Sequence, residues 1–220
     1  ATVDSVVVIW QDGNRSKLEK VATNQVMTIT HNQSKAGNYA NENNENLHAH
    51  YFKEVTKELG INYIHKEVDY IDYNIQPMLP HKLSQYGPNL AVADVNQDGL
   101  EDVFIGGSHF EKGIFLVQQE DGQFQEQDLI QYNGKEDYKS EELGAVLFDA
   151  DNDGDNDLYI VHGGYEYDLP DSQYVDRLYT NENGQFIWNK NALPQLTFSG
   201  LSVKAADYDK DGDLDLFVGG

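Results

Sequence analysis

Oxygen-bearing side chains recur at alternate positions in three short segments of the chain. Each segment follows the pattern D-x-[DN]-x-D-G-x-x-D, and the three begin at Asp94, Asp149 and Asp207. Alternate residues of a curled loop point inward, and a hard cation such as Ca²⁺ prefers six to eight oxygen ligands. The glycine at the sixth position permits the sharp turn that such a loop needs. The pattern therefore predicts up to three bound Ca²⁺ ions, and Mg²⁺ fits less well because it demands a strict octahedron.

Each loop is predicted to offer side-chain oxygens from positions 1, 3, 5 and 9 and a backbone carbonyl from position 7. In the first loop these are Asp94, Asn96, Asp98 and Asp102, with the carbonyl of Leu100. In the second they are Asp149, Asp151, Asp153 and Asp157, with the carbonyl of Asp155. In the third they are Asp207, Asp209, Asp211 and Asp215, with the carbonyl of Asp213. The first loop has an amide in place of one carboxylate, so it is predicted to be the weakest site.

Two other interpretations of these loops are possible. An EF-hand needs an acidic residue at position 12 and flanking helices, but position 12 is Ile105, Ile160 or Val218 and the flanks are β-rich. Solvated acidic turns without a metal are the second alternative. Crowding carboxylates into nine residues costs about 1 kcal/mol per close pair even in water, and a bound cation would offset that repulsion. We therefore expect each loop to bind a cation and to join two strands.

The spacing of the loops indicates a structural repeat. Their first aspartates lie 55 and then 58 residues apart, and the segment 114–124 is echoed by the segment 176–186, 62 residues later. Each repeat predicts a strand, an acidic loop, a strand, a variable stretch and a hairpin, which is the content of one propeller blade. The predicted fold class is all-β: a partial β-propeller of four-stranded antiparallel blades, with calcium-binding loops between the first two strands of each blade.

The loops and the tails that follow them resemble a known family. The tails read Phe-Ile-Gly-Gly at 104–107 and Phe-Val-Gly-Gly at 217–220. Over roughly residues 84–220 the pattern is similar to the FG-GAP/VCBS repeat of integrin-type β-propellers. The resemblance implies that the family's calcium ligands carry over to the loop residues named above. Such propellers usually have about seven blades, so we expect about two and a half blades of a longer protein in residues 51–220.

The N-terminal region has a different sequence pattern from the acidic repeats. Strands are predicted at Val3–Trp10, 17–21 and 25–30, with a turn at 11–14, and the motif V-x-W-x-x-G begins at Val8. Residues 1–30 resemble the end of the ASPIC/UnbV module, which accompanies FG-GAP repeats in many exported proteins. Residues 31–50 are predicted to be a polar linker. A tyrosine-rich run at 61–73 suggests either ordinary sheet packing, which we favour, or a sugar-stacking platform.

Composition excludes several classes of partner. The chain has 220 residues, a formal net charge of −23 and no cysteine. Such an acidic surface repels phosphate, so we expect no nucleic-acid partner. The longest apolar run, Val6–Trp10, is too short for membrane insertion, and disulfides are impossible. The chain starts at Ala1, so any export signal is expected to have been removed or not included. The family resemblance and weak calcium loops together suggest an extracellular, cell-surface or periplasmic location.

No catalytic constellation is evident, so we expect no enzymatic activity. Glu141 and Glu142 are predicted to point to opposite faces of a strand and to be solvated, and His109 and His162 to be structural or solvated. The expected function is adhesion or recognition of an unknown protein or glycan ligand, with structural calcium. The alternatives are a non-catalytic accessory domain of a secreted polysaccharide-acting enzyme and a structural spacer.

Overall fold

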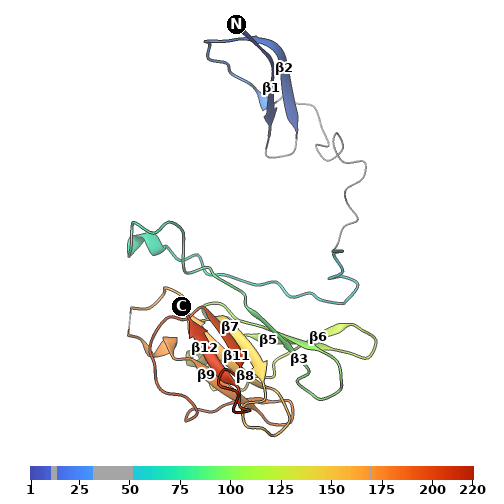
Figure 1. The fold of residues 1–220 in the computed structure, drawn as a ribbon, viewed down its shortest axis with the longest axis vertical. Helices are drawn as coiled ribbons and strands as arrows, with labels where there is room; N and C mark the ends of the chain where they lie inside the picture. The colour runs from blue at the N-terminus through green and yellow to red at the C-terminus, as the bar shows by residue number, and fades with distance from the viewer. Residues whose placement is uncertain (11–13, 32–51, 169) are drawn as a thin grey trace. The chain divides into compact units, whose positions relative to one another are not determined.

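The computed structural model describes residues 1–10, 14–31, 52–168 and 170–220 (Figure 1). The chain divides into two compact units, Ala1–Glu54 and Val55–Gly220. The described residues fold mainly as β-strands and include three short 3-10 helices, which are η3 (Asp72–Asn74), η4 (Lys135–Tyr138) and η5 (Ser172–Tyr174). None of the helices in this part of the chain has the length and apolar character needed to cross a membrane.

The first unit contains one antiparallel hairpin. Strand β1 (Thr2–Ile9) pairs with β2 (Arg15–Ala22), and the Trp10 indole donates a hydrogen bond to the Ser16 hydroxyl at 3.0 Å. These strands confirm two of the three predicted in this region. The strand predicted at 25–30 is wrong, because those residues form no ladder and Val26 is fully exposed. Most of the predicted turn and nearly all of the predicted linker lie outside the described residues.

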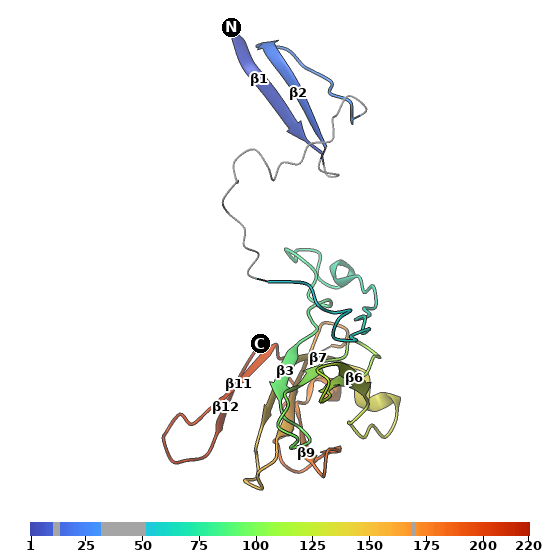
Figure 2. The same cartoon turned by 90° about the vertical axis from the view of Figure 1, so that its right-hand side faces the viewer.

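The second unit contains three antiparallel sheets in which consecutive strands are neighbours (Figure 2). The first sheet consists of β3 (Leu90–Ala93), β4 (Asp102–Ile105), β5 (Ile114–Gln118) and β6 (Phe124–Gln127). The second consists of β7 (Glu141–Phe148), β8 (Asp157–Gly163), β9 (Arg177–Asn181) and β10 (Phe186–Trp188). The third consists of β11 (Ser202–Ala206) and β12 (Asp215–Gly219). These sheets confirm the predicted all-β fold of four-stranded blades.

The sheets stack face to face through their apolar side chains. Phe115 of the first sheet stacks on Phe186 of the second, with ring centroids 4.7 Å apart, inside a cluster drawn from both sheets. A second cluster joins Tyr159 and Val161 of the second sheet to Val203 of the third. Strand β7 contacts both β3 and β11, so the first strands of the three sheets lie side by side. Each buried large side chain contributes roughly 1.5–3 kcal/mol, which makes this stacking the main source of order.

The Gly-Gly tails let neighbouring sheets approach closely. A Cβ on Gly163 would lie 2.1 Å from the carbonyl oxygen of Gly200, just before β11. A Cβ on Gly106 would lie 2.5 Å from the carbonyl oxygen of Glu142, at the start of β7. Because no side chain fits there, the end of each second strand can touch the backbone that begins the next sheet. This contact explains the tail that recurs in the sequence.

The segment before the first sheet is irregular. Sheet packing was predicted for the tyrosine-rich run, but residues 61–71 form no strand, so that prediction is wrong. The backbone polar groups find partners in loops instead. The Leu59 carbonyl accepts from the Phe124 N–H at 2.8 Å, and the buried Asp72 carboxylate accepts from the Ser84 N–H at 3.0 Å. The segment is therefore ordered by individual hydrogen bonds rather than by a ladder.

Candidate metal centre

The three acidic loops lie where the sequence predicted them, between the first two strands of each sheet. Residues 94–101 join β3 to β4, 149–156 join β7 to β8, and 207–214 join β11 to β12. In every loop the fourth and sixth residues have positive φ, and these residues are Gln97, Gly99, Asn152, Gly154, Lys210 and Gly212. Glycine adopts this conformation readily, whereas another residue type pays roughly 1–2 kcal/mol. The three loops therefore share one curled backbone, and the left-handed fourth position was not foreseen from sequence.

Backbone N–H groups orient the carboxylates of the loops. The Asp94 carboxylate accepts from the Gly99 N–H at 2.8 Å, and the Asp98 carboxylate accepts from the Leu100 N–H at 2.8 Å. The same pattern holds in the other loops for the residue pairs Asp149 and Gly154, Asp153 and Asp155, Asp207 and Gly212, and Asp211 and Asp213. These bonds fix the side chains of positions 1 and 5 within the curl of each loop. Backbone hydrogen bonds thus fix the positions of the carboxylate oxygens that could bind a metal ion.

The second and third loops each gather three carboxylates. Oxygens of one group all lie within 4.8 Å of one another, and so do those of the other; the groups are Asp149, Asp151 and Asp153, and Asp207, Asp209 and Asp215. In the first loop the Asn96 amide occupies the third position, and its nitrogen donates to the Asp98 carboxylate at 3.0 Å. All of these donors are oxygens from carboxylates or amides, which suits a hard divalent cation.

The ninth position has a structural role in two loops. Asp102 and Asp157 are buried, and each carboxylate accepts two backbone N–H bonds. Asp157 bonds to Ala150 at 2.9 Å and to Asn181 at 2.8 Å, which ties the loop to strand β9. Burial raises the pKa of both carboxyls, and these N–H bonds oppose the rise. Asp215 is exposed and has one such bond, to Tyr208 at 2.9 Å. Each carboxylate oxygen keeps a second lone pair that could bind a metal ion. Metal ligation at position 9 therefore stays possible, and it remains a prediction.

Asp155 adds an acidic side chain to the second loop. Only its backbone carbonyl was predicted to face a cation. Partial burial, together with the charges of Asp153 and Asp157, raises the pKa of its carboxyl to about 6. Part of this rise comes from the crowding of negative charge in the loop, which a bound cation would relieve. The sequence feature that could have indicated this side chain is an aspartate at position 7, in a loop that has aspartates at positions 1, 3, 5 and 9.

Two amide side chains, Asn156 of the second loop and Asn181 of β9, hold the first loop in place. The Asn156 amide donates to the Asp94 carbonyl at 2.9 Å. The Asn181 amide donates to the Val95 carbonyl at 2.9 Å and to the Asn156 carbonyl at 3.2 Å. The first two loops are therefore neighbours, and a change in one is expected to be felt in the other. No pattern in the sequence pointed to these residues.

The adjacent glutamates at the start of β7 are buried, so the prediction that they are solvated is wrong. Each is 1% exposed. Strand β7 belongs to the middle sheet and contacts strands of both neighbouring sheets, β3 and β11. The Glu142 carboxylate accepts from the Gly107 N–H at 2.8 Å and the Tyr132 hydroxyl at 3.2 Å, and burial raises its pKa to about 7. This carboxyl links the first two sheets.

Glu141 faces a different environment. Its two oxygens have no conventional hydrogen-bond donor among the described residues, and burial, together with the nearby Glu166 carboxylate, raises its pKa to about 9. Burial and repulsion between the two nearby carboxylates both disfavour the ionised form of Glu141. His162 is also buried, and burial holds its pKa well below the ordinary value, so the ring is neutral. That burial agrees with the structural role expected for His162.

Comparison with known proteins identifies both parts of the chain. The FG-GAP-like repeat family matches residues 94–160 and again residues 149–218, and the ASPIC and UnbV family matches residues 1–36. No curated protein matches the chain significantly. The repeat matches together span more than half of the sequence, and they cover the three acidic loops and most of the strands that flank them. Domains of both types are typical of exported, β-propeller-containing proteins. Residues 1–36 are therefore similar to the ASPIC and UnbV family, and the chain belongs to the FG-GAP-like repeat family.

Proposed function

We propose that this chain is a calcium-binding β-propeller segment of an exported or cell-surface protein, and that it serves adhesion or ligand recognition. The observation that carries the calcium assignment is the grouping of three carboxylates in the second loop and three in the third, each group within 4.8 Å. Oxygen-only donors and a curled backbone support Ca²⁺ over softer metals. The residues that would hold the ions are those at positions 1, 3, 5, 7 and 9 of each loop.

The proposed role of calcium is structural. Each ion would offset the repulsion among carboxylates and clasp the turn between the first two strands of a blade. Extracellular modules bind Ca²⁺ at about 10⁻⁴–10⁻³ M, which matches the concentration outside cells. A single loop would supply almost all of the ligands of each ion. Little space would then be left at the ion for a substrate. We therefore propose that the segment is non-catalytic and recognises a protein or glycan rather than nucleic acid.

A calcium titration tests this proposal. Calorimetry on EDTA-stripped protein should detect up to three ions, with a rise in melting temperature. At a free Ca²⁺ concentration 100 times Kd, each independent site should add roughly 2.7 kcal/mol to the free energy of unfolding. The double variant Asp151→Asn with Asp153→Asn should lose one ion. Glu120→Gln removes an exposed charge outside the loops and is the matched control. Absence of both heat and thermal shift at about 10 mM Ca²⁺ would refute the calcium assignment, because that concentration exceeds the expected Kd.

A further inference from the structure

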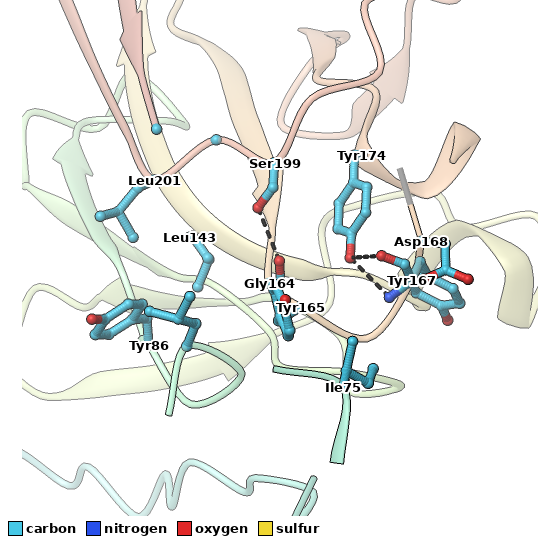
Figure 3. Close-up of a pocket in the computed structure, with 13 residues that line it drawn as sticks. Ile75, Tyr86, Leu143, Gly164, Tyr165, Tyr167, Asp168, Tyr174, Ser199 and Leu201 are labelled. Carbon is cyan, nitrogen blue, oxygen red and sulfur yellow. Dashed lines mark hydrogen bonds between the residues drawn. The ribbon is translucent and has the colours of Figure 1, made fainter. Parts of the chain in front are cut away.

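The second unit contains a cavity of about 430 Å³ that the metal centre does not use (Figure 3). Its walls come from the segment between η3 and β3, from β7, from the loop after β8 and from the residues before β11. Four tyrosines line it together with aliphatic side chains, and these tyrosines are Tyr86, Tyr165, Tyr167 and Tyr174. In Figure 3, Tyr86 lies on one side, Tyr167 and Tyr174 on the other, and Leu143 between them. The volume falls within the roughly 300–1,000 Å³ typical of small-ligand sites.

Three of the four tyrosine hydroxyls around the cavity are already engaged by the protein, those of Tyr86, Tyr165 and Tyr174. The Tyr174 hydroxyl donates to the Tyr167 carbonyl at 3.0 Å and accepts from the Tyr167 N–H at 2.9 Å. The Tyr165 hydroxyl donates to the Gln76 side chain at 2.7 Å, and the Tyr86 hydroxyl meets the His81 ring. A sugar would leave buried hydroxyls without partners here, at a cost of about 1–3 kcal/mol each. The cavity therefore favours a ligand that makes few directional hydrogen bonds.

The charge around the cavity is negative. Among the described residues that line it, Asp168 is charged and none is Lys, Arg or His. Gly164 forms part of the wall, and the carboxylates of Glu141 and Glu166 lie directly behind it. A Cβ at Gly164 would lie 2.2 Å from a Glu166 carboxylate oxygen and 3.3 Å from one of Glu141. The pKa of Tyr167 is raised to about 12 by burial and by the nearby acidic groups, Glu166 foremost among them. An anion is disfavoured in this field, whereas a cation is attracted.

We propose that this cavity binds a quaternary ammonium group, such as the trimethylammonium head of a choline-type solute. Such a cation has no N–H to donate, is weakly hydrated and is attracted to aromatic rings. Aromatic walls, hydroxyls that mostly have protein partners, and the exposed carboxylate of Asp168 match those three properties. This inference goes beyond the protein or glycan recognition proposed above, and it does not depend on calcium in the loops.

Three small probes distinguish the chemical origin of binding. Choline, its neutral isostere 3,3-dimethylbutan-1-ol and phosphocholine are titrated into the full 220-residue, calcium-saturated protein and followed by NMR shifts. We expect saturable choline binding at least about 10-fold tighter than that of the neutral alcohol, because charge and cation–π attraction are both lost in the isostere. Phosphocholine should bind more weakly than choline, since its phosphate meets an acidic surface. Equal binding of choline and the alcohol, or no saturation by about 50 mM choline, overturns the proposal.

Variants at the cavity separate the aromatic contribution from packing. Tyr86→Phe keeps the ring and should keep choline affinity, whereas Tyr86→Leu keeps an apolar wall and should weaken it about 5-fold or more. Asp168→Asn should weaken choline but leave the neutral alcohol unchanged. Melting temperatures verify that each variant is folded. Unchanged choline affinity in both Tyr86→Leu and Asp168→Asn overturns the proposal. Calcium binding without choline binding refutes this inference alone, and choline binding without calcium binding refutes only the metal assignment.

Discussion

Replacing Asp157 by asparagine tests whether the ninth loop position fastens the loop to its sheet. The buried carboxylate accepts from the Ala150 N–H at 2.9 Å and the Asn181 N–H at 2.8 Å. An asparagine amide has one oxygen, so it can accept from only one of them and turns its own NH₂ toward the other. A buried donor without a partner costs about 1–3 kcal/mol, and the surviving bond loses its charge assistance. The neutral amide recovers part of the desolvation cost. We expect a net loss of about 2–4 kcal/mol in the free energy of unfolding.

Asp215 supplies the matched comparison at the same position of the third loop. It is exposed, and its carboxylate accepts one backbone hydrogen bond of 2.9 Å, from the Tyr208 N–H. Asp215→Asn should therefore cost at most about 1 kcal/mol, because water can replace the lost bond. Urea unfolding in EDTA at pH 7 measures both variants without the contribution of metal binding. If the two substitutions cost the same within about 0.5 kcal/mol, the argument from buried N–H donors is refuted.

Three other expectations follow from particular residues. Because the pKa of Glu141 is raised to about 9 in the folded protein, the folded state holds a proton that the unfolded state releases above its ordinary pKa of 4.5. Stability should therefore fall as pH rises from 5 to 9, by at most about 1.4 kcal/mol per pH unit for this proton, and Glu141→Gln should flatten that fall in urea midpoints. Asn96→Asp should tighten Ca²⁺ binding by the first loop several-fold in calorimetry, and unchanged affinity would show that its third position does not ligate. Gly163→Ala should lower the free energy of unfolding by about 2 kcal/mol or more, measured by thermal unfolding, because its Cβ would lie 2.1 Å from a carbonyl oxygen. Gly219 stands at the equivalent position of the third repeat, and a Cβ there would lie 3.5 Å from the nearest atom. Gly219→Ala should therefore be nearly neutral.

Local patterns in the sequence determined the repeating architecture. Alternate acidic residues with a glycine at position 6 specify a curled loop, and apolar residues on either side specify strands. These features depend on neighbours within about ten residues, so the places of β3, β4, β7, β8, β11 and β12 could be predicted. The same local logic failed at 25–30 and 61–71, where strand-like composition has no neighbouring strand with which to pair. Strand propensity forms a ladder only where tertiary structure supplies a partner.

Only the tertiary structure decided the burial and the hydrogen bonding of the acidic side chains. Glu141 and Glu142 look like a solvated pair in sequence, but stacking of sheets on both faces buries them. Asp102 and Asp157 look like metal ligands, and the fold adds a second task by placing backbone N–H groups from β5 and β9 against them. The tyrosine cavity likewise joins segments more than 100 residues apart in the chain. Burial and long-range contacts set these environments, and neither is encoded in any short window of residues.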